Sequence, residues 1–364
     1  MRLTWLKKRS LIPLLLLLLT SLSLTACSTG PTTAQEPAIA TRLVTDTIGR
    51  QVAVPDEINS IGTLFAVAGH ITTMLGEGEK ITAISNGLRR DKLLLEICPS
   101  IGESVIPKVS GSINVEEVLN ADPDLIFIDN EIATFEKETS KFDKLNIPYF
   151  VVDFNTIDEQ LYLVQQMGIA LHQEEEAQGY IDFYKDCIER VEAVVATIPM
   201  DQRVRIYHSV NEATRTDAPG TLPADWLKVV GAINVSLEDP LEFTDNKYFA
   251  SLEQIMMWNP DVILVNEEGV DDYIRTKDQW QTLDAVINDR VYRMPLGISR
   301  WGHPTSIETP LAILWTAKTL YPDYFADLDL KVESRYFYKE FFEYDISEEF
   351  LDLILASENS RYEK

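Results

Sequence analysis

The chain has 364 residues, of which 45% are hydrophobic and 25% charged; the composition is ordinary for a folded soluble protein, and the length exceeds what one core usually supports. It carries 58 Asp and Glu residues against 32 Lys and Arg residues, a formal net charge of −26. Nucleic acid is therefore excluded as an expected partner, because phosphates need cationic groups.

Residues 1–26 have the order of a secretory signal: four cations in MRLTWLKKRS, the apolar run LIPLLLLLLTSLSL, then LTAC ending at Cys27. The run is shorter than the ~20 residues of a membrane helix, so cleavage is expected. LTAC resembles the bacterial lipoprotein box, which implies a lipid on the Cys27 thiol; an incidental thiol is the alternative. Residues 27–41 then form a flexible tether. The mature protein is expected outside the cytoplasm, membrane-anchored at the cell surface or in the periplasm.

Cleavage would remove four cations and no acid, which leaves 28 Lys and Arg residues against 58 acids. This charge indicates either a self-repelling surface or attraction to a basic docking partner. Only Cys98 and Cys187 remain after Cys27, too few for a disulfide framework, so one bridge and two buried thiols stay open as alternatives.

Residues 42–156 are expected to form an N-terminal α/β lobe. RLVTDTIGRQVAVP predicts two short strands around a turn at Gly49. INSIGTLFAVAGHITTMLGEGEKITAIS predicts a strand, a helix that stops at Gly76, and a new strand from Lys80. KFDKLNIPYFVVDF adds the end of a helix, a turn and a strand.

Residues 157–197 contain no proline and are expected to be a helical connector. Residues 198–364 are expected to form a C-terminal α/β lobe with further helices at its end. Its strand RVRIYHSV precedes a loop and a helix that ends near Gly231, and WQTLDAVINDRVYRMP gives helix, turn and strand. Alternating strands and helices in both halves predict two parallel-rich sheets, with a ligand cleft at the carboxyl ends of their strands.

One element of the sequence occurs twice. VEEVLNADPDLIFI at 115–128 returns as LEQIMMWNPDVILV at 252–265, with a constant offset of 137 residues (252 against 115). Each copy predicts a short amphipathic helix, stopped by proline, and then a buried strand. Identical residues meet at Glu116 and Glu253, at Pro123 and Pro260, and at Asp124 and Asp261. The repeat indicates two lobes of one design.

The order of these motifs, with the late WGHP before a helix, resembles the substrate-binding proteins of ABC importers for iron-siderophores, haem and cobalamin, the type III periplasmic binding proteins. The resemblance runs from about Leu43 to the closing FYKEFFEYDIS. It implies two Rossmann-like lobes joined by one long connector helix, at about Glu174 to Val195, a ligand cleft between the lobes, and binding without catalysis.

The resemblance also implies a role for the repeat. In this family each lobe presents one glutamate that docks on arginines of a permease subunit, and the matching positions are Glu116 and Glu253. A single first-turn glutamate would be explained by the helix dipole, but the shared register favours docking. The expected partners are a permease dimer with its ATPase subunits, and the protein itself is expected to be a monomer.

ISRWGHP places Arg300, Trp301 and His303 in the expected cleft. An indole can stack on a macrocycle or catecholate, an arginine offsets the negative charge of a ferric chelate, and His303 can complete the coordination of a chelated metal. Packing of Trp301 against the next helix and a turn role for His303 are the alternatives. The other candidates follow strands in either lobe: Phe65, Asn86, Arg89, Arg90, Tyr207 and Arg215.

The expected ligand is a ferric siderophore, with haem or cobalamin next, and no intrinsic cofactor is expected. A rival is a binder of bare Zn, Mn or Ni, which needs three or four convergent ligands, whereas the chain has only His70, His172, His208 and His303. A second rival is an extracytoplasmic enzyme, although G-x-S-x-G, H-E-x-x-H and P-loop motifs are missing from the sequence. A third is an adhesive surface lipoprotein.

Overall fold

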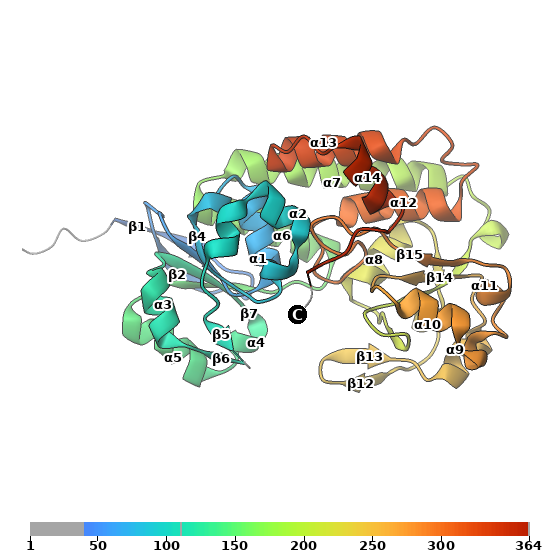
Figure 1. Ribbon diagram of the computed structural model, residues 1–364, viewed down its shortest axis with the longest axis horizontal. Coiled ribbons are helices and arrows are strands. Elements are labelled where there is room, and N and C mark those ends of the chain that lie inside the picture. Colours follow the sequence, from blue (N-terminus) through green and yellow to red (C-terminus); the bar gives the residue numbers. More distant parts are fainter. Residues whose placement is uncertain (1–39, 110, 363–364) are drawn as a thin grey trace, which may run out of the picture. The chain divides into compact units, whose positions relative to one another are not determined.

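The computed structural model describes residues 40–109 and 111–362 (Figure 1). The predicted signal peptide, Cys27 and nearly all of the predicted tether lie outside the described residues. The chain from Ile39 onward forms one compact unit. Within it, two parallel sheets organise two α/β lobes, as the sequence predicts.

The sheet of the N-terminal lobe has four strands in the order β4-β3-β7-β8, and every neighbouring pair is parallel. A hairpin of β1 and β2 precedes it, with the turn at Gly49 as predicted. The strands are β1 (Thr41–Thr45), β2 (Gln51–Pro55), β3 (Ile61–Thr63), β4 (Ile81–Ile84), β5 (Lys108–Val109), β6 (Ser112–Ile113), β7 (Leu125–Asp129) and β8 (Tyr149–Val152). The helices are α1 (Ala66–Met74), α2 (Lys92–Ile97), α3 (Val115–Ala121), α4 (Asn130–Ala133) and α5 (Glu136–Leu145).

The sheet of the C-terminal lobe repeats this design in the order β11-β9-β14-β15, again parallel throughout. A small antiparallel sheet, β10-β13-β12, stands beside it. The strands are β9 (Arg205–Ser209), β10 (Arg215–Thr216), β11 (Ile233–Asn234), β12 (Glu242–Thr244), β13 (Lys247–Phe249), β14 (Val262–Val265) and β15 (Val291–Arg293). The helices are α8 (Leu222–Val229), α9 (Leu252–Trp258), α10 (Val270–Thr276), α11 (Asp284–Ile287), α12 (Thr309–Leu320), α13 (Leu330–Phe342) and α14 (Glu348–Leu355).

The two copies of the repeat fold as α3-β7 and α9-β14, which confirms the predicted helix and buried strand. They also hold the same register: Leu125 lies opposite Ile61 of β3, and its repeat partner Val262 lies opposite Ile206 of β9. Each helix ends just before its proline, at a residue with a left-handed backbone conformation. In α3 this residue is Asp122, with φ of 44°. In α9 the corresponding left-handed residue is Asn259, with φ of 41°. The left-handed cap ends each helix, and the proline then prevents its continuation.

The segment predicted as a helical connector, residues 157–197, contains two helices, of which the second is the predicted connector helix. Thr156 caps α6 (Ile157–Leu171), which ends at a left-handed His172, φ 58°. The second helix, α7 (Glu174–Val195), has the bounds expected for the connector helix. The two helices pack closely at Gly168, where a Cβ atom would come within 2.6 Å of the Cβ of Ala177. The predicted segment 157–197 is thus helical but folded back on itself.

The core joins the lobes to the connector. One cluster of buried apolar residues runs from the β1-β2 hairpin through α1, α6 and α7 to α8 and α12–α14. Two smaller clusters lie on the other faces of the sheets. In Figure 1, α7, α12 and α13 lie together along one side of both lobes. Cys98 and Cys187 are both buried free thiols, which decides between the alternatives left by the sequence.

Candidate functional site

The loop between β15 and α12 is pinned by a buried carboxyl group. Glu308 accepts hydrogen bonds from the backbone N–H groups of Ile298 and Ser299 (3.1 and 2.6 Å), from Ser299 Oγ (2.8 Å) and from Tyr338 Oη (2.6 Å). A side chain at Gly297 would overlap the Glu308 carboxylate, so this close approach requires glycine. Burial raises the pKa of Glu308. The residues that follow Ser299 therefore leave a rigid anchor.

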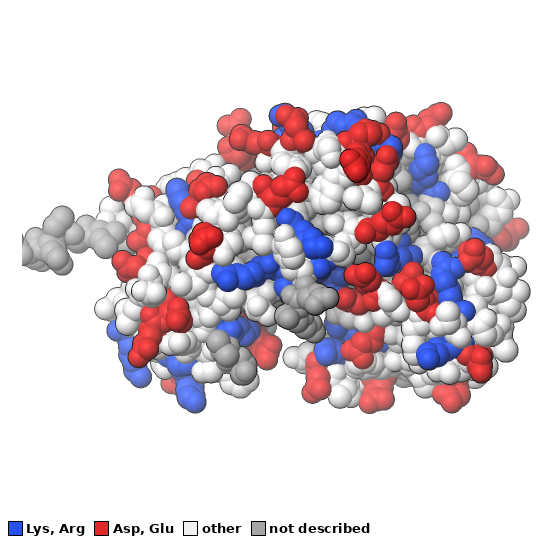
Figure 2. All heavy atoms as spheres, viewed as in Figure 1, with Lys and Arg blue, Asp and Glu red and all other residues white. Residues whose placement is uncertain are grey.

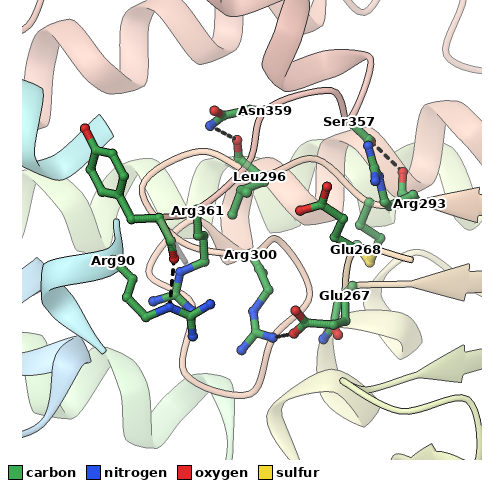
Figure 3. Close-up of a pocket in the computed structure, with 12 residues that line it drawn as sticks. Arg90, Glu267, Glu268, Arg293, Leu296, Arg300, Ser357, Asn359 and Arg361 are labelled. Atoms are coloured by element: carbon green, nitrogen blue, oxygen red, sulfur yellow. Dashed lines mark hydrogen bonds and ion pairs between the residues drawn. The ribbon is translucent and has the colours of Figure 1, made fainter. Parts of the chain in front are cut away.

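Arg300 extends from this anchor into a pocket between the lobes. The pocket is also lined by Arg90 from the N-terminal lobe and by Arg361 from the segment after α14. Figure 3 shows the three guanidinium groups facing the same space, with Arg300 paired to Glu267. Burial, followed by repulsion from Arg361, lowers the pKa of Arg300 to about 10. Four arginines therefore line the pocket against two carboxylates, those of Glu267 and Glu268, which leaves an excess of positive charge in an acidic protein.

A second pocket has Pro304, the residue after His303, in its lining. Arg215 and Pro304 line it together with Phe154 of the N-terminal lobe. Thr305 N donates to His303 Nδ1 at 3.2 Å, which leaves Nε2 as the other ring nitrogen. Burial and then repulsion by Arg300 and Arg215 hold the pKa of His303 well below its usual value.

The cationic side chains of the cleft are only partly neutralised. Glu267 pairs with Arg300, and Asp91 pairs with Arg361. Among the described residues, Arg90 and Arg215 have no carboxylate within ion-pair distance. In the face shown in Figure 2, Lys and Arg atoms gather at the centre, between the lobes, while Asp and Glu atoms dominate the upper rim. The cleft is therefore suited to an anion.

The other three histidines lie apart from one another, two of them in buried pairs with an aspartate. His70 Nε2 lies 2.8 Å from Asp91 Oδ2, and His208 Nδ1 lies 3.0 Å from Asp217 Oδ2, each pair being buried. His172 ends α6. Across residues 40–109 and 111–362, no group of three or more His, Cys, Asp or Glu side chains is arranged to hold a metal ion.

Two of the predicted ligand contacts do not fit the structure. Trp301 is fully buried in the main core, whereas Arg300, its neighbour on the same loop, lines the pocket. Tyr207 is also fully buried, on the sheet face opposite the main core, and its hydroxyl donates to Ala213 O at 3.0 Å. His208, on the alternate face, is buried as well. Neither Tyr207 nor Trp301 is exposed to stack on a ligand.

The remaining predicted residues are divided between pocket and periphery. Arg90 lines the pocket, whereas the Arg89 guanidinium is bonded to Ser104 O. Asn86 is exposed, and Phe65 packs against the main core. Sequence reasoning missed Arg361, an isolated arginine outside any repeat or recognisable motif.

The repeat presents its glutamates to solvent. Glu116 and Glu253 are exposed in the first turns of α3 and α9, and neither forms an ion pair with another described residue. Three residues further on, Leu119 is 55% exposed and its repeat partner Met256 is 43% exposed. Each lobe therefore offers a free carboxylate beside an exposed apolar side chain.

The sequence profile of the periplasmic binding protein family matches residues 100–296, more than half of the chain. The chain belongs to this family. Within its described part, no helix of this periplasmic binding protein combines the length and apolarity needed to cross a membrane. The family and its relatives make it a solute-binding protein of an ABC importer.

Several relatives cover most of this periplasmic binding protein. The molybdate-binding protein MolA of Haemophilus influenzae is 26% identical over 335 residues, 84% of this chain and 92% of MolA. The structure of MolA bound to molybdate has a TM-score of 0.73 at 22% identity, covering 84% of this chain and 99% of that one. A periplasmic solute-binding protein of Veillonella parvula has a TM-score of 0.74 at 23% identity, with coverage of 86% and 97%.

A further relative is named as a lipoprotein. The uncharacterized ABC transporter substrate-binding lipoprotein YvrC of Bacillus subtilis is 22% identical over 290 residues, 78% of this chain and 87% of YvrC.

Proposed function

We propose that this protein captures an anionic, metal-containing ligand outside the cytoplasm and delivers it to an ABC permease. The observation that carries the proposal is the gathering of arginines in two pockets, with Arg90 and Arg300 lining one and Arg215 lining the other. Among the described residues, Arg90 and Arg215 form no ion pair. Guanidinium groups bind oxyanions through paired N–H donors, and they favour no neutral or cationic ligand in this way.

A tetrahedral metal oxyanion of the molybdate class is the ligand that these groups favour. MolA, which resembles this chain over most of its length, is named for binding molybdate. A negatively charged ferric chelate is the second candidate, since it could use the same arginines. The ferric siderophore that the sequence favoured loses support, because its expected stacking partner Trp301 is buried. The same burial removes the basis for a flat haem ligand.

Binding of a bare cation fits this site poorly. A transition-metal ion needs several neutral or anionic ligands, whereas four guanidinium groups line the pocket and no histidine does, and one of its two carboxylates, Glu267, is paired with Arg300. The match to a family of binding proteins supports a binding role rather than an enzymatic one.

The proposal is tested by titrating residues 28–364 with molybdate, tungstate, sulfate, an anionic ferric catecholate, haem, cobalamin and bare Zn, Mn and Ni ions, each followed by calorimetry. Saturable binding of molybdate or of the anionic chelate is expected. Arg300→Ala and Arg215→Ala should each weaken it by about ten- to hundredfold, since a charged hydrogen bond contributes about 1.5–3 kcal/mol.

Arg335→Ala is the matched control, because Arg335 lies on α13 and pairs only with the exposed Glu348. It should leave the affinity unchanged. Tight binding of a bare cation together with no response to any anion would overturn the proposal.

The anchoring and the docking remain part of the same proposal. The LTAC sequence before and at Cys27 and the lipoprotein relative YvrC support a lipid on that cysteine. The paired exposure of Glu116 and Glu253 supports docking on two permease subunits. Mass spectrometry of the membrane fraction tests the first point: a mature chain that starts at Cys27 with added acyl mass is expected, and Cys27→Ala should release the protein from the membrane.

A further inference from the structure

The residues that follow α14 cross from one lobe to the other; Ser357–Tyr362 is called the strap below. On the side of the C-terminal lobe, Ser357 Oγ donates to Arg293 O at 2.6 Å, and Asn359 Nδ2 donates to Leu296 O at 2.8 Å. Both contacts are visible in Figure 3. They fix the start of the strap to the segment that leads from β15 into the ligand loop.

On the side of the N-terminal lobe, the strap pairs with Arg90. Tyr362 N donates to Arg90 O at 2.9 Å, and the Arg90 side chain returns a hydrogen bond from Nε to Tyr362 O at 3.0 Å. Lys92 Nζ donates to Ser360 Oγ at 2.8 Å. The strap therefore orients Arg90, one of the arginines of the pocket, as well as touching both lobes.

Of the strap residues that line the pocket, Arg361 is the charged one. Its guanidinium donates to Gly87 O at 2.7 Å and pairs with Asp91 at 2.5 Å. Asp91 is 1% exposed and is also in contact with His70, so this carboxylate is held from two sides. The Arg361 side chain keeps 19% of its surface exposed and lines the pocket with Arg90 and Arg300.

We propose that the strap is a component of the ligand site and that Arg361 binds the anion directly, beside Arg90 and Arg300. The inference rests on the proposed function and extends it to a residue that no sequence motif marks. Guanidinium groups from three separate segments can surround a small oxyanion with paired N–H donors, and the Asp91 pair holds Arg361 in place before the ligand arrives. The alternative is that the strap blocks the pocket and that a ligand displaces it. Displacement would break the hydrogen bond by which Tyr362 orients Arg90, so the geometry favours a strap that stays in place and binds the ligand.

The first test measures the affinity of residues 28–364 for molybdate by calorimetry. Arg361→Ala is expected to weaken binding by about ten- to hundredfold, and Arg361→Lys by less, because lysine keeps the charge but loses the fork of donors. Arg335→Ala is the control and should bind as the unchanged protein does. Unchanged or tighter binding by Arg361→Ala would show that the strap is a spectator or a plug, and would overturn the inference.

The second test examines the role of Arg361 in holding the strap without using any ligand. Hydrogen exchange of the unliganded protein should become at least tenfold faster at the amides of Arg90 and Tyr362 in Arg361→Ala, and remain unchanged in Arg335→Ala. Unaltered exchange would refute the role of Arg361 in holding the strap even if no anion bound. If exchange is faster in Arg361→Ala but the unchanged protein does not bind molybdate, the role of Arg361 in holding the strap stands and the proposed function is wrong.

Discussion

At the scale of single residues, the basic side chains between the lobes lie close enough together to lower one another's pKa values. Arg300 has a lowered pKa, and His303 is kept neutral by burial and by the neighbouring Arg300 and Arg215. An anion placed among these groups reverses the repulsion between them. The lowered pKa values of Arg300 and His303 thus favour a negatively charged ligand, and the hydrogen bonds of the buried Glu308 hold the loop that carries both residues in place.

This arrangement predicts that ligand affinity depends on pH through His303. The pKa of His303 is depressed in the free protein, and a bound anion raises it, so the complex binds more protons than the free protein. Affinity for molybdate should therefore rise as the pH falls from 7 to 5, by at most about tenfold per pH unit. Calorimetry in buffers of different ionisation enthalpy should also detect proton uptake.

His303→Gln should abolish both the pH slope and the proton uptake, while retaining binding. His172→Asn is the control, because His172 ends α6 in a left-handed conformation that asparagine tolerates. An unaltered slope in His303→Gln would assign the titration to another group.

At the scale of secondary-structure elements, the repeat has a structural task besides its surface role. Asp124 Oδ2 accepts from the backbone N–H groups of Asn59 and Ser60 at 2.7 and 3.1 Å, immediately before β3. Asp261 Oδ2 accepts from Arg205 N at 3.0 Å, at the start of β9. Each repeat therefore fastens its own strand to the neighbouring central strand, which accounts for the shared Pro-Asp sequence without reference to any partner.

Loss of either carboxylate should destabilise the protein. Asp124→Ala and Asp261→Ala leave backbone donors without their acceptor, so the free energy of unfolding should fall by about 1–3 kcal/mol in each case. Urea unfolding of residues 28–364 measures this fall. Asp327→Ala, at an exposed position after α12, should change the same free energy by no more than about 0.5 kcal/mol. Equal effects of all three changes would contradict the capping role.

At the scale of the whole molecule, the described residues combine two lobes with a shared core. The main apolar cluster includes residues of both sheets, of α6 and α7, and of α12–α14. Relative movement of the lobes would expose part of this cluster to water, at about 25 cal/mol per Å² of apolar surface. The shared core favours a rigid body that presents Glu116 and Glu253 at a fixed separation.

This rigidity leads to a prediction about transport. The double change Glu116→Ala with Glu253→Ala should leave ligand affinity within about twofold, because neither side chain lines the cleft, and should abolish uptake by cells that carry the importer. Glu174→Ala with Glu175→Ala removes two exposed acids from the first turn of α7 and should transport normally. Normal uptake by the Glu116 and Glu253 double variant would show that the repeat has only its structural task.

The amino-acid sequence by itself determined the elements and their order. Periodicity and turn residues predicted the β1-β2 hairpin and both copies of the repeat close to their observed bounds, while the bounds of α7 came from the resemblance to the family. These features are local: an amphipathic spacing or a Pro-Asp pair acts within a few residues of chain. The α/β class follows from the same local signals.

The composition of the cleft was decided by tertiary structure. Sequence placed Trp301 and Arg300 on the same loop, but only the packing of the loop on Glu308 turns one side chain into the core and the other into the pocket. Arg361 lies 61 residues after Arg300 and 271 after Arg90, differences that follow from their numbers in the chain. No local pattern relates residues so far apart, because their meeting depends on how the strap crosses between two separately folded sheets.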